Sequence, residues 1–330
     1  MAQVVCITGA GAGVGRATVA EFARKGWDVA LLSRDPGRLE EAAAEVRRHG
    51  GRALPISTDV ADAEAVFAAA DRIEAELGPI DVWINVAMAT VFAPVDKLTP
   101  EEVARGTAVT YLGQVHGMMA ALRHMRPRNR GTIVNVGSAL AYRSVPLQSI
   151  YCGAKFAVRG FTDSLRSELL HDRINVNLCM VHLPAMNTPQ FDWALNKMGH
   201  KAQPVPPVFQ PEVAAREIHW AALHPRRQTW VGWPTVKAIV AGRLMPGLVD
   251  RYLASAGYSG QLTSETVPTT QSGNLFQPVP GHFGAHGRFD SVARPRSWEV
   301  FTSHHRTALW ATLGIAALFG LHQLAKRLDI

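Results

Sequence analysis

Cysteine is scarce in this sequence, and its few cysteines form no recognisable ligand set or redox pair. Cys6, Cys152 and Cys179 stand far apart in a chain of 330 residues, so neither a zinc site nor a CxxC motif is indicated. The histidines are scattered without the spacing of metal ligands, although His182 follows a predicted strand and could face a site there. We expect no metal centre and thiols that stay reduced, as in the cytoplasm.

Acidic residues are the minority among the charged side chains, and the formal net charge is +7. A basic balance is compatible with nucleic acid, an anionic membrane or a phosphorylated ligand. The densest basic stretch, residues 123–130, carries no nucleic-acid motif and fits a helix end followed by a solvated loop. The first residues also lack the pattern of a signal peptide, because an apolar strand-like run begins at Val4. We therefore expect a cytoplasmic catalytic domain with no nucleic-acid partner.

Strand-like and helix-like segments alternate over the first half of the chain. Short apolar runs typical of buried strands occur at residues 4–7, 29–32, 53–56, 82–85, 132–136 and 174–180. Helical patterns lie between them at residues 16–25, 40–48, 63–77, 101–125 and 151–170. This order predicts an α/β fold: a Rossmann-type, doubly wound parallel sheet with helices on both faces. Ligands of such sheets bind at the carboxyl ends of the strands.

The pattern loosens after residue 187, and we predict four regions. Residues 1–235 form a Rossmann-fold dinucleotide-binding catalytic domain, 236–256 a helical extension, 257–303 an irregular Gly/Pro-rich segment, and 304–330 a terminal helix. The uncharged run 307–321 is slightly shorter than the roughly 20 residues of a membrane-spanning helix. The flanking Arg306 and Lys326 could serve as interfacial anchors. A membrane anchor, an amphipathic surface helix and a helix buried in an oligomer remain the alternatives.

A glycine-rich turn follows the first predicted strand and precedes a helix. In this position Gly9 permits the tight turn, Gly13 lets the backbone approach a pyrophosphate, and Gly15 allows the helix to pack closely on the strand. The helix N-terminus then faces the negative charge of a dinucleotide. A glycine triplet alone is a weak signal, but the βαβ context favours the functional interpretation.

The end of the second predicted strand indicates which dinucleotide is bound. An acidic residue there would hold a free ribose 2′-hydroxyl, whereas an arginine suits a 2′-phosphate. Ser33 is small and Arg34 is cationic, so the sequence favours NADP over NAD, with the neighbouring Asp35 as a reservation.

Tyr151 and Lys155 are four residues apart at the start of a predicted helix, so both project from one face. A tyrosine with a pKa near 10 is a weak acid–base catalyst at neutral pH, but a nearby ammonium and an oxidised nicotinamide ring lower that pKa. Ser138, just after the fifth predicted strand, could hold a substrate carbonyl while Tyr151 gives it a proton. The three residues predict hydride transfer between nicotinamide and a carbonyl/alcohol pair.

Taken together, these motifs resemble those of the short-chain dehydrogenase/reductase family, over about residues 1–235. The matching pieces are Thr8-Gly9-x-x-x-Gly13-x-Gly15, Asp59-Val60, Asn85-Val86-Ala87, Ser138 and Tyr151-x-x-x-Lys155. The resemblance implies that Asp59 and Val60 meet the adenine, that Asn85 supports the central strand and the cofactor, and that Thr188 touches the nicotinamide carboxamide. It also implies a homodimer or homotetramer, formed through the helices around 101–125 and 151–170. The expected cofactor-binding residues are Thr8, Gly9, Gly11, Gly13, Val14, Gly15, Ser33, Arg34, Asp59, Val60, Asn85, Ala87, Tyr151, Lys155, Pro184 and Thr188.

Three places depart from the family pattern. Met88 stands where a glycine is usual, and Leu183 and Pro184 replace the Pro-Gly that precedes Thr188. Thr110 occupies the position of an asparagine that completes a proton relay to the lysine, and we expect its hydroxyl to join the catalytic residues Ser138, Tyr151 and Lys155. Two rivals to an enzyme stay open: a dinucleotide-binding sensor without turnover, and a membrane-tethered interaction protein.

The segment after the sixth predicted strand usually covers the active site in this architecture. Met186, Phe191, Trp193 and Met198 would give such a lid an apolar lining, and plain packing on the domain is the alternative. The lining predicts a hydrophobic small-molecule alcohol or ketone as substrate, such as a lipid, a steroid or a retinoid-like compound.

Overall fold

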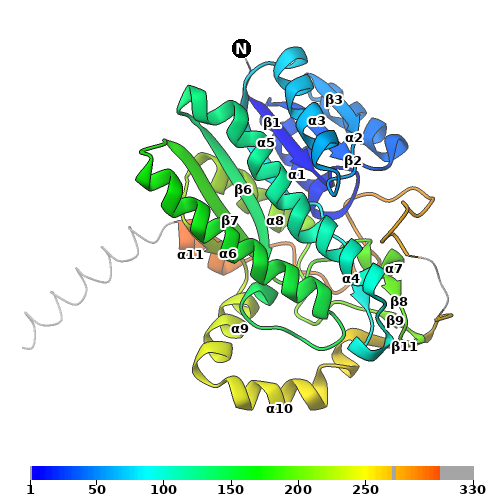
Figure 1. The fold of residues 1–330 in the computed structure, drawn as a ribbon. Helices are drawn as coiled ribbons and strands as arrows, with labels where there is room; N and C mark the ends of the chain where they lie inside the picture. Colours follow the sequence, from blue (N-terminus) through cyan, green and yellow to red (C-terminus); the bar gives the residue numbers. More distant parts are fainter. Residues whose placement is uncertain (1, 270–272, 305–330) are drawn as a thin grey trace, which may run out of the picture.

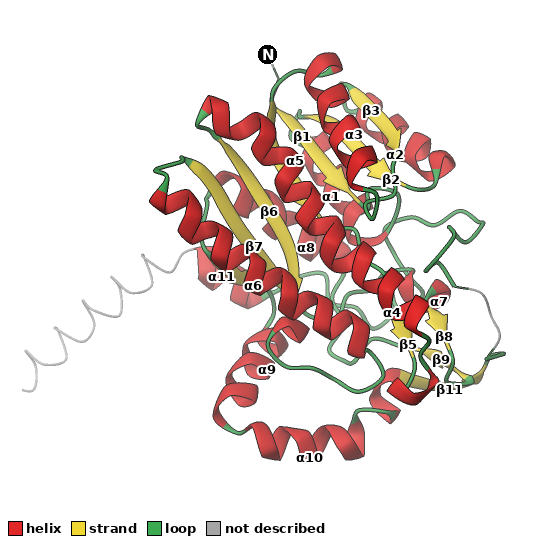
Figure 2. Ribbon diagram, viewed as in Figure 1, coloured by secondary structure: helices red, strands yellow, loops and turns green. Residues whose placement is uncertain are grey.

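The computed structural model describes residues 2–269 and 273–304. Its centre is a sheet of seven strands, all parallel, in the order β10-β7-β6-β4-β1-β2-β3 (Figures 1 and 2). The strands are β1 (Val4–Thr8), β2 (Asp28–Ser33), β3 (Ala53–Ser57), β4 (Ile80–Asn85), β6 (Gly131–Ser138), β7 (Val176–Leu183) and β10 (Gln228–Trp230). The direction of winding reverses between β1 and β4, where such sheets bind their ligands. The predicted doubly wound fold is confirmed.

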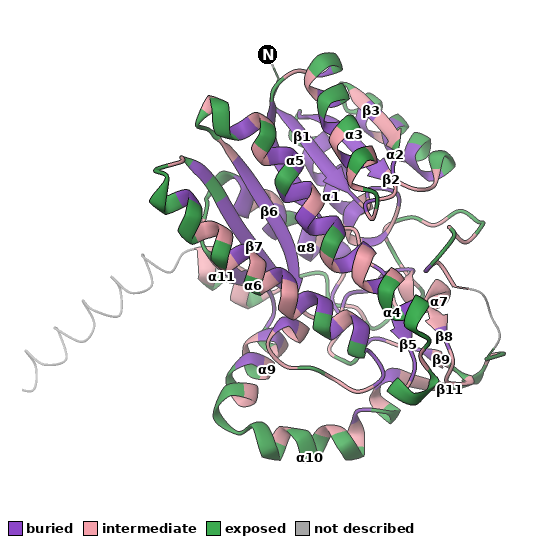
Figure 3. Cartoon of the chain, viewed as in Figure 1, coloured by how far each residue is buried: buried purple, intermediate pink, exposed green. Residues whose placement is uncertain are grey.

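Helices cover both faces of this sheet. On one face lie α1 (Gly13–Arg24), α2 (Pro36–Arg48) and α8 (Pro211–Leu223), which share one apolar core with the strands. On the other face lie α3 (Ala63–Glu76), α5 (Gly113–Arg128) and α6 (Ser149–His171), which enclose a second core. The five inner strands are almost entirely buried, whereas the edge strands β3 and β10 are only partly buried (Figure 3). Burial on both faces explains why the inner strands read as continuous apolar runs.

The helix that the sequence predicts at 101–125 is divided into three parts. α4 (Pro100–Thr107) begins with a capping box between Thr99 and Glu102. A π-helical turn, η2 (Ala108–Leu112), follows and leads into α5. The π turn inserts one residue into the helical ladder, and periodicity alone did not reveal it. It turns Thr110, which is fully buried, towards the loop after β4.

Smaller elements lie beyond the carboxyl ends of the strands. The strand pairs are β5 (Val91–Phe92) with β8 (Leu195–Asn196), and β9 (His200–Ala202) with β11 (Leu262–Thr266). The short helical segments are η1 (Val95–Lys97), η3 (Ala139–Ala141), α7 (Gln190–Trp193) and η4 (Ser259–Gln261). Strand β11 means that the segment predicted to be irregular contains regular structure, because its backbone pairs with β9.

The helical extension consists of α9 (Trp233–Leu244) and α10 (Pro246–Ala256), and it begins three residues before the predicted start at 236. The last described helix is α11 (Trp298–His304). Within residues 2–269 and 273–304 we find no helix long and apolar enough to cross a membrane. The predicted terminal helix falls almost wholly on residues 305–330, outside the described part, and the four predicted region boundaries stay predictions.

Candidate active site

A cavity of about 470 Å³ lies at the carboxyl ends of the strands, where the winding reverses. Its walls come from the glycine loop after β1, the end of β6, the start of α6 and the segment that follows β7. All three predicted catalytic residues with a direct chemical role, Ser138, Tyr151 and Lys155, line it. The sheet therefore gathers residues far apart in sequence around one space large enough for a small ligand.

The catalytic side chains are held by β6 and α6. Ser138 is the last residue of β6, and its hydroxyl hydrogen-bonds to Tyr151 on the first turn of α6. Lys155 lies one turn further along the helix, with its Nζ 5.5 Å from the centre of the Tyr151 ring. That ammonium donates a hydrogen bond to the carbonyl oxygen of Val136 on β6, at 2.6 Å. The lysine is thus fixed between strand and helix and cannot swing into solvent.

Burial sets the protonation of both groups. It raises the pKa of Tyr151 to about 12, although the hydrogen bond from Ser138 lowers it. It also lowers the pKa of Lys155 to about 7, because a buried ammonium loses its hydration. In the protein without a dinucleotide, Tyr151 therefore keeps its proton at neutral pH. A positive charge nearby, such as an oxidised nicotinamide ring, favours the phenolate.

Thr110 supports the loop that follows β4. Its hydroxyl donates to the carbonyl oxygen of Ala89 and accepts from the backbone N–H of the same residue, both at 2.9 Å. These two bonds join the π turn to the loop after β4. Because Thr110 does not line the cavity, a direct catalytic role for it stays a prediction, and the observed contacts make it a support of that loop.

The glycine loop has the shape that a pyrophosphate needs. Gly9 and Gly13 have φ angles of +69° and +58°, which side chains rarely adopt. A Cβ on Gly15 would lie 2.0 Å from the carbonyl oxygen of Gly9, and one on Gly9 would lie 2.9 Å from the Cα of Ala87. The backbone is packed too tightly for any larger residue. Helix α1 begins at Gly13, so its N-terminus faces the cavity.

Most of the predicted cofactor residues line the cavity, but two do not. Thr8 and Asn85 lie behind it. The Thr8 hydroxyl accepts from the backbone N–H groups of Val86 and Ala87, at 3.0 and 3.2 Å. Asn85 is fully buried and donates to the Oδ1 of Asn135, at 2.8 Å. Both residues therefore hold β1, β4 and β6 in register, and they would act on a dinucleotide through the loops that they fix.

The adenosine end of the cavity contains two arginines. Arg34 follows β2 as predicted, and Arg38 lies one turn into α2, where the sequence reasoning missed it. No helical spacing marked Arg38 in the sequence, because Arg34 precedes the helix and only Arg38 lies on it. Asp35 caps α2 and pairs with the Arg38 Nε at 3.2 Å. Because Asp35 is used as a cap and as a partner of Arg38, the acidic residue beside Arg34 does not argue against NADP.

A C-terminal segment, which we call the strap (residues 274–290), crosses this end of the cavity. Arg34 donates to the carbonyl oxygens of Leu275 and Phe276, at 3.3 and 3.0 Å, and Arg38 donates to that of Gly281, at 3.3 Å. The strap also contacts the glycine loop, because the Gly284 carbonyl accepts from the Gly13 N–H at 3.0 Å. These contacts could not be predicted from residue types, because they use backbone carbonyls.

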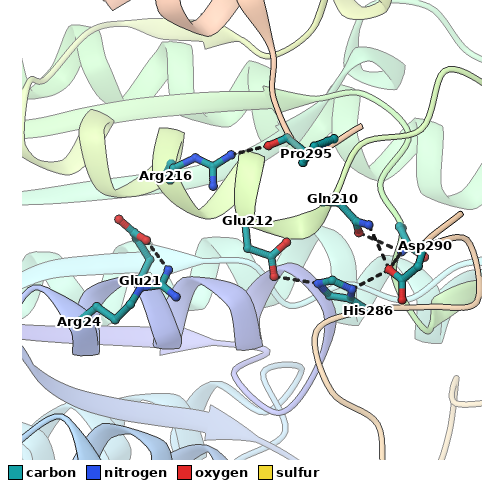
Figure 4. A network of polar contacts seen from close by, with 9 residues as sticks. Glu21, Arg24, Gln210, Glu212, Arg216, His286, Asp290 and Pro295 are labelled. Carbon is teal, nitrogen blue, oxygen red and sulfur yellow. Dashed lines mark hydrogen bonds and ion pairs between the residues drawn. The ribbon is translucent and has the colours of Figure 1, made fainter. Parts of the chain in front are cut away.

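Charged side chains hold the far end of the strap to α8 (Figure 4). His286 lies between the carboxylates of Glu212 and Asp290, at 2.8 and 2.7 Å. Asp290 also accepts from the Nδ2 of Asn187, at 2.7 Å, and from the Nε2 of Gln210, at 3.0 Å. Burial lowers the pKa of His286, but the two carboxylates outweigh it and raise that pKa overall. We call these five residues the clamp.

His182, the histidine singled out for testing, lies on β7 behind the catalytic serine and does not line the cavity. Its Nδ1 is 3.2 Å from the carbonyl oxygen of Ser138. It fills the space left by Gly137, where a Cβ would lie 2.5 Å from the imidazole. Burial lowers the pKa of His182 to about 4, so the ring is neutral and packs as part of the core. Among the described residues no cluster of potential metal ligands is found.

The fold and the site together define a nicotinamide-dinucleotide oxidoreductase that acts on a carbonyl/alcohol pair. A profile described as "short chain dehydrogenase" matches residues 3–194. The chain belongs to the short-chain dehydrogenase/reductase family, as the resemblance of its motifs implied, and neither rival to an enzyme is favoured by these matches.

A curated relative agrees with this assignment, and two solved structures share the fold. The chain is 29% identical over 318 residues to the uncharacterized oxidoreductase YxnA of Bacillus subtilis, covering 96% of this chain and 88% of the relative. It superimposes, with a TM-score of 0.59 and 23% identity over 70% of its length and 96% of the other's, on an alcohol dehydrogenase from Thermococcus sibiricus complexed with 5-hydroxy-NADP. It also superimposes on a short chain dehydrogenase from Mycobacterium paratuberculosis bound to NAD, with a TM-score of 0.60 and 23% identity. That match covers 67% of this chain and 90% of the other.

Proposed function

We propose that this protein is an NADP(H)-dependent dehydrogenase or reductase of an apolar alcohol/ketone pair. The observation that carries the proposal is the convergence of Ser138, Tyr151 and Lys155 on the cavity that also contains the glycine loop. Bound nicotinamide supplies or accepts the hydride. The protein's own residues supply the proton, orient the substrate oxygen and keep the reacting groups out of water.

Each catalytic residue has one task in this mechanism. In reduction, Tyr151 donates its phenolic proton to the substrate oxygen as negative charge develops there, and Ser138 donates a hydrogen bond to the same oxygen. Lys155, fixed by its bond to Val136, places a cation beside the phenol and lowers the pKa of Tyr151 once a dinucleotide is bound. In oxidation the same groups act in reverse, with the phenolate of Tyr151 accepting the proton.

Preference for NADP over NAD is supported by Arg34 and Arg38. Both line the adenosine end of the cavity, and two guanidinium groups suit a 2′-phosphate. The acidic residue nearby, Asp35, is already used as a helix cap and as a partner of Arg38. The arginines donate to strap carbonyls, and a phosphate would replace these contacts with stronger, charge-assisted hydrogen bonds.

An apolar substrate is supported by the walls of the cavity near the catalytic residues. Of the four predicted lid residues, Met186 and Phe191 line the cavity and Met198 does not, whereas Trp193 lines its other end, with its ring centre 5.0 Å from the guanidinium of Arg38. Side chains from α9 and α10 extend this apolar wall. A lipid, a steroid or a retinoid-like compound would bury its carbon skeleton there and present one oxygen to Tyr151.

Assembly and location are part of the same proposal. Exposed apolar side chains on α4, α5 and α6, namely Val103, Met119 and Leu170, are 41%, 47% and 74% accessible. Such residues suit the predicted dimer or tetramer contact through these helices. We further propose a cytoplasmic catalytic domain whose C-terminal segment, residues 304–330, contacts a membrane.

The test of the cofactor proposal is a titration of the full chain with NADPH and NADH, followed by nicotinamide fluorescence. We expect tighter binding of NADPH, and we expect Arg34→Ala to weaken NADPH at least tenfold while changing NADH little, because it removes a partner of the 2′-phosphate. Equal weakening of both nucleotides would refute the phosphate role. A screen that shows turnover only of small polar sugars would refute the apolar substrate.

A further inference from the structure

Helices α9 and α10 form a hairpin whose outer surface is apolar and exposed. Leu244 is 73% accessible, Leu248 61% and Tyr252 66%, and Val240 and Met245 are also exposed. In Figure 3, α10 is coloured mostly as exposed and lies away from the central sheet, at the bottom of the view. None of its residues is buried. So many large apolar side chains on one hairpin indicate a binding surface.

The spacing of these residues places them in rows along each helix. Val240 and Leu244 are four apart on α9, and Leu248 and Tyr252 are four apart on α10, so each pair faces one direction. A helix of 11 residues is only marginally stable in water and needs packing of its apolar face. Leu253 and Ala256 of α10 face the cavity, and a partner that covers the outer row would add to the packing of this short helix. The charges of the hairpin indicate what kind of partner that is.

Basic residues accompany the apolar rows. Lys237 and Arg251 are exposed on the hairpin, and Arg243 is exposed with its guanidinium 5.2 Å from the centre of the Tyr142 ring. The one acidic residue of the hairpin, Asp250, is paired with Arg143. An apolar surface with a basic border suits an anionic lipid bilayer, which takes up the side chains and attracts the cations. A second copy of the chain fits less well, because a two-fold contact would bring identical basic surfaces together.

The hairpin also borders the substrate cavity. Tyr252, Leu253 and Ala256 of α10, together with Pro234 and Ala238 of α9, line it. Tyr252 is exposed to solvent and lines the cavity at the same time. One surface thus joins the outside of the hairpin to the apolar wall near the catalytic residues.

We propose that the surface of α9 and α10 docks on an anionic lipid bilayer, and that apolar substrate enters the cavity from the lipid past Tyr252. This surface is distinct from the terminal segment. The docking stands on the exposed side chains alone, whereas the entry route rests on the proposed function.

The first experiment measures binding of the full chain to vesicles of phosphatidylcholine, with and without phosphatidylglycerol, by co-sedimentation. We compare the wild type with Leu244→Glu/Leu248→Glu and with a control that adds the same charge elsewhere, Val95→Glu/Leu223→Glu, at side chains that are 70% and 45% accessible. We expect the hairpin variant to bind the anionic vesicles at least tenfold more weakly than the wild type and the control. Equal binding of all three proteins, or no binding by the wild type, overturns the docking.

A second experiment detects contact between the hairpin and lipid, even if the terminal segment binds lipid on its own. The three native cysteines are buried, so a polarity-sensitive fluorophore can be attached at Leu248→Cys, with Val95→Cys as the control. Anionic vesicles should shift the emission of the first label to shorter wavelength and leave the second unchanged. No shift at position 248 overturns the docking. A lower molar mass for Leu244→Glu/Leu248→Glu than for the wild type, both without lipid, identifies a subunit interface and also overturns it.

Kinetics separate the docking from the proposed function. With turnover established, the hairpin variant should keep its rate on a water-soluble ketone and lose at least fivefold on a long-chain ketone held in anionic vesicles. An equal loss on both substrates overturns the entry route. If neither substrate is turned over and NADPH does not bind, the proposed function fails, while the vesicle results still decide the docking.

Discussion

The catalytic residues and the strap border the same cavity and are held in place by different contacts. Ser138 and Lys155 are 7% and 1% accessible and are fixed by the packing of β6 against α6. Leu275 anchors the start of the strap in the second core, and the rest of the strap is held by its carbonyl oxygens on Arg34 and Arg38 and by the partly exposed clamp around His286. Packing in a core resists small perturbations, whereas exposed polar contacts are weak and sensitive to salt and pH.

This difference suits the two tasks: the catalytic groups need a rigid setting, whereas entry and exit of a ligand need a segment that can move aside. A proton donor must be placed within hydrogen-bonding reach of the substrate oxygen, and small displacements reduce the rate strongly. In the proposed binding mode, by contrast, a dinucleotide that reaches Arg34 and Arg38 would enter and leave past the strap. We infer that substitutions in the catalytic half change the rate of turnover, and that substitutions in the strap change the exchange of the cofactor.

The largest expected effect is that of Tyr151→Phe. Removing the phenolic proton should lower kcat at least about a thousandfold, within the range of general acid–base catalysis. NADPH affinity should change less than about threefold, since the ring and its packing remain. Steady-state kinetics and nucleotide fluorescence measure the two quantities. A variant that keeps a tenth of the wild-type kcat would contradict the mechanism.

A smaller but still large effect is expected for Gly15→Ala. The new Cβ would lie 2.0 Å from the carbonyl oxygen of Gly9, so the glycine loop must move away from its place under the pyrophosphate. We expect NADPH affinity to fall about a hundredfold, or about 2.7 kcal/mol. The matched control is Gly160→Ala on α6, where nothing lies within 4 Å of the new Cβ. Similar affinity in both variants would show that the loop adapts.

The same contrast explains what could be read from the sequence. The glycine loop and Tyr151-x-x-x-Lys155 are local patterns, and alternating apolar segments predicted the sheet that brings them together. Strand β10 has three residues and was not predicted, because so short a run shows no periodicity of apolar residues. Arg38 and the strap were missed because their contacts join positions more than 240 residues apart through backbone carbonyls, which leave no trace in residue type.

The buried Lys155 predicts a pH effect on stability. Its pKa is about 7 in the folded protein and about 10.5 when unfolded, so the unfolded chain binds more protons between these values. The free energy of unfolding should therefore rise with pH over this range, by about 2–3 kcal/mol between pH 7 and 9. Lys155→Met should lack this contribution. Urea unfolding of both proteins without cofactor tests it, and parallel pH dependences would contradict it.

The smallest expected effect concerns the clamp, where His286 is 40% accessible and its partners Glu212 and Asp290 are 33% and 60% accessible. Such exposed ion pairs contribute at most about 1 kcal/mol, so His286→Gln should raise amide hydrogen exchange in the strap up to about fivefold.

Because the pKa of His286 is raised on folding, its contribution is complete at low pH and is lost as the pH rises through the folded-state value. Strap protection in the wild type, corrected for intrinsic exchange, should accordingly decrease from pH 6 to 8.5, and in His286→Gln it should stay level. Exchange in α6 serves as the internal control, since its packing does not depend on the clamp. A wild-type strap whose protection is independent of pH would show that its carbonyl contacts with Arg34 and Arg38 hold it without help from the clamp.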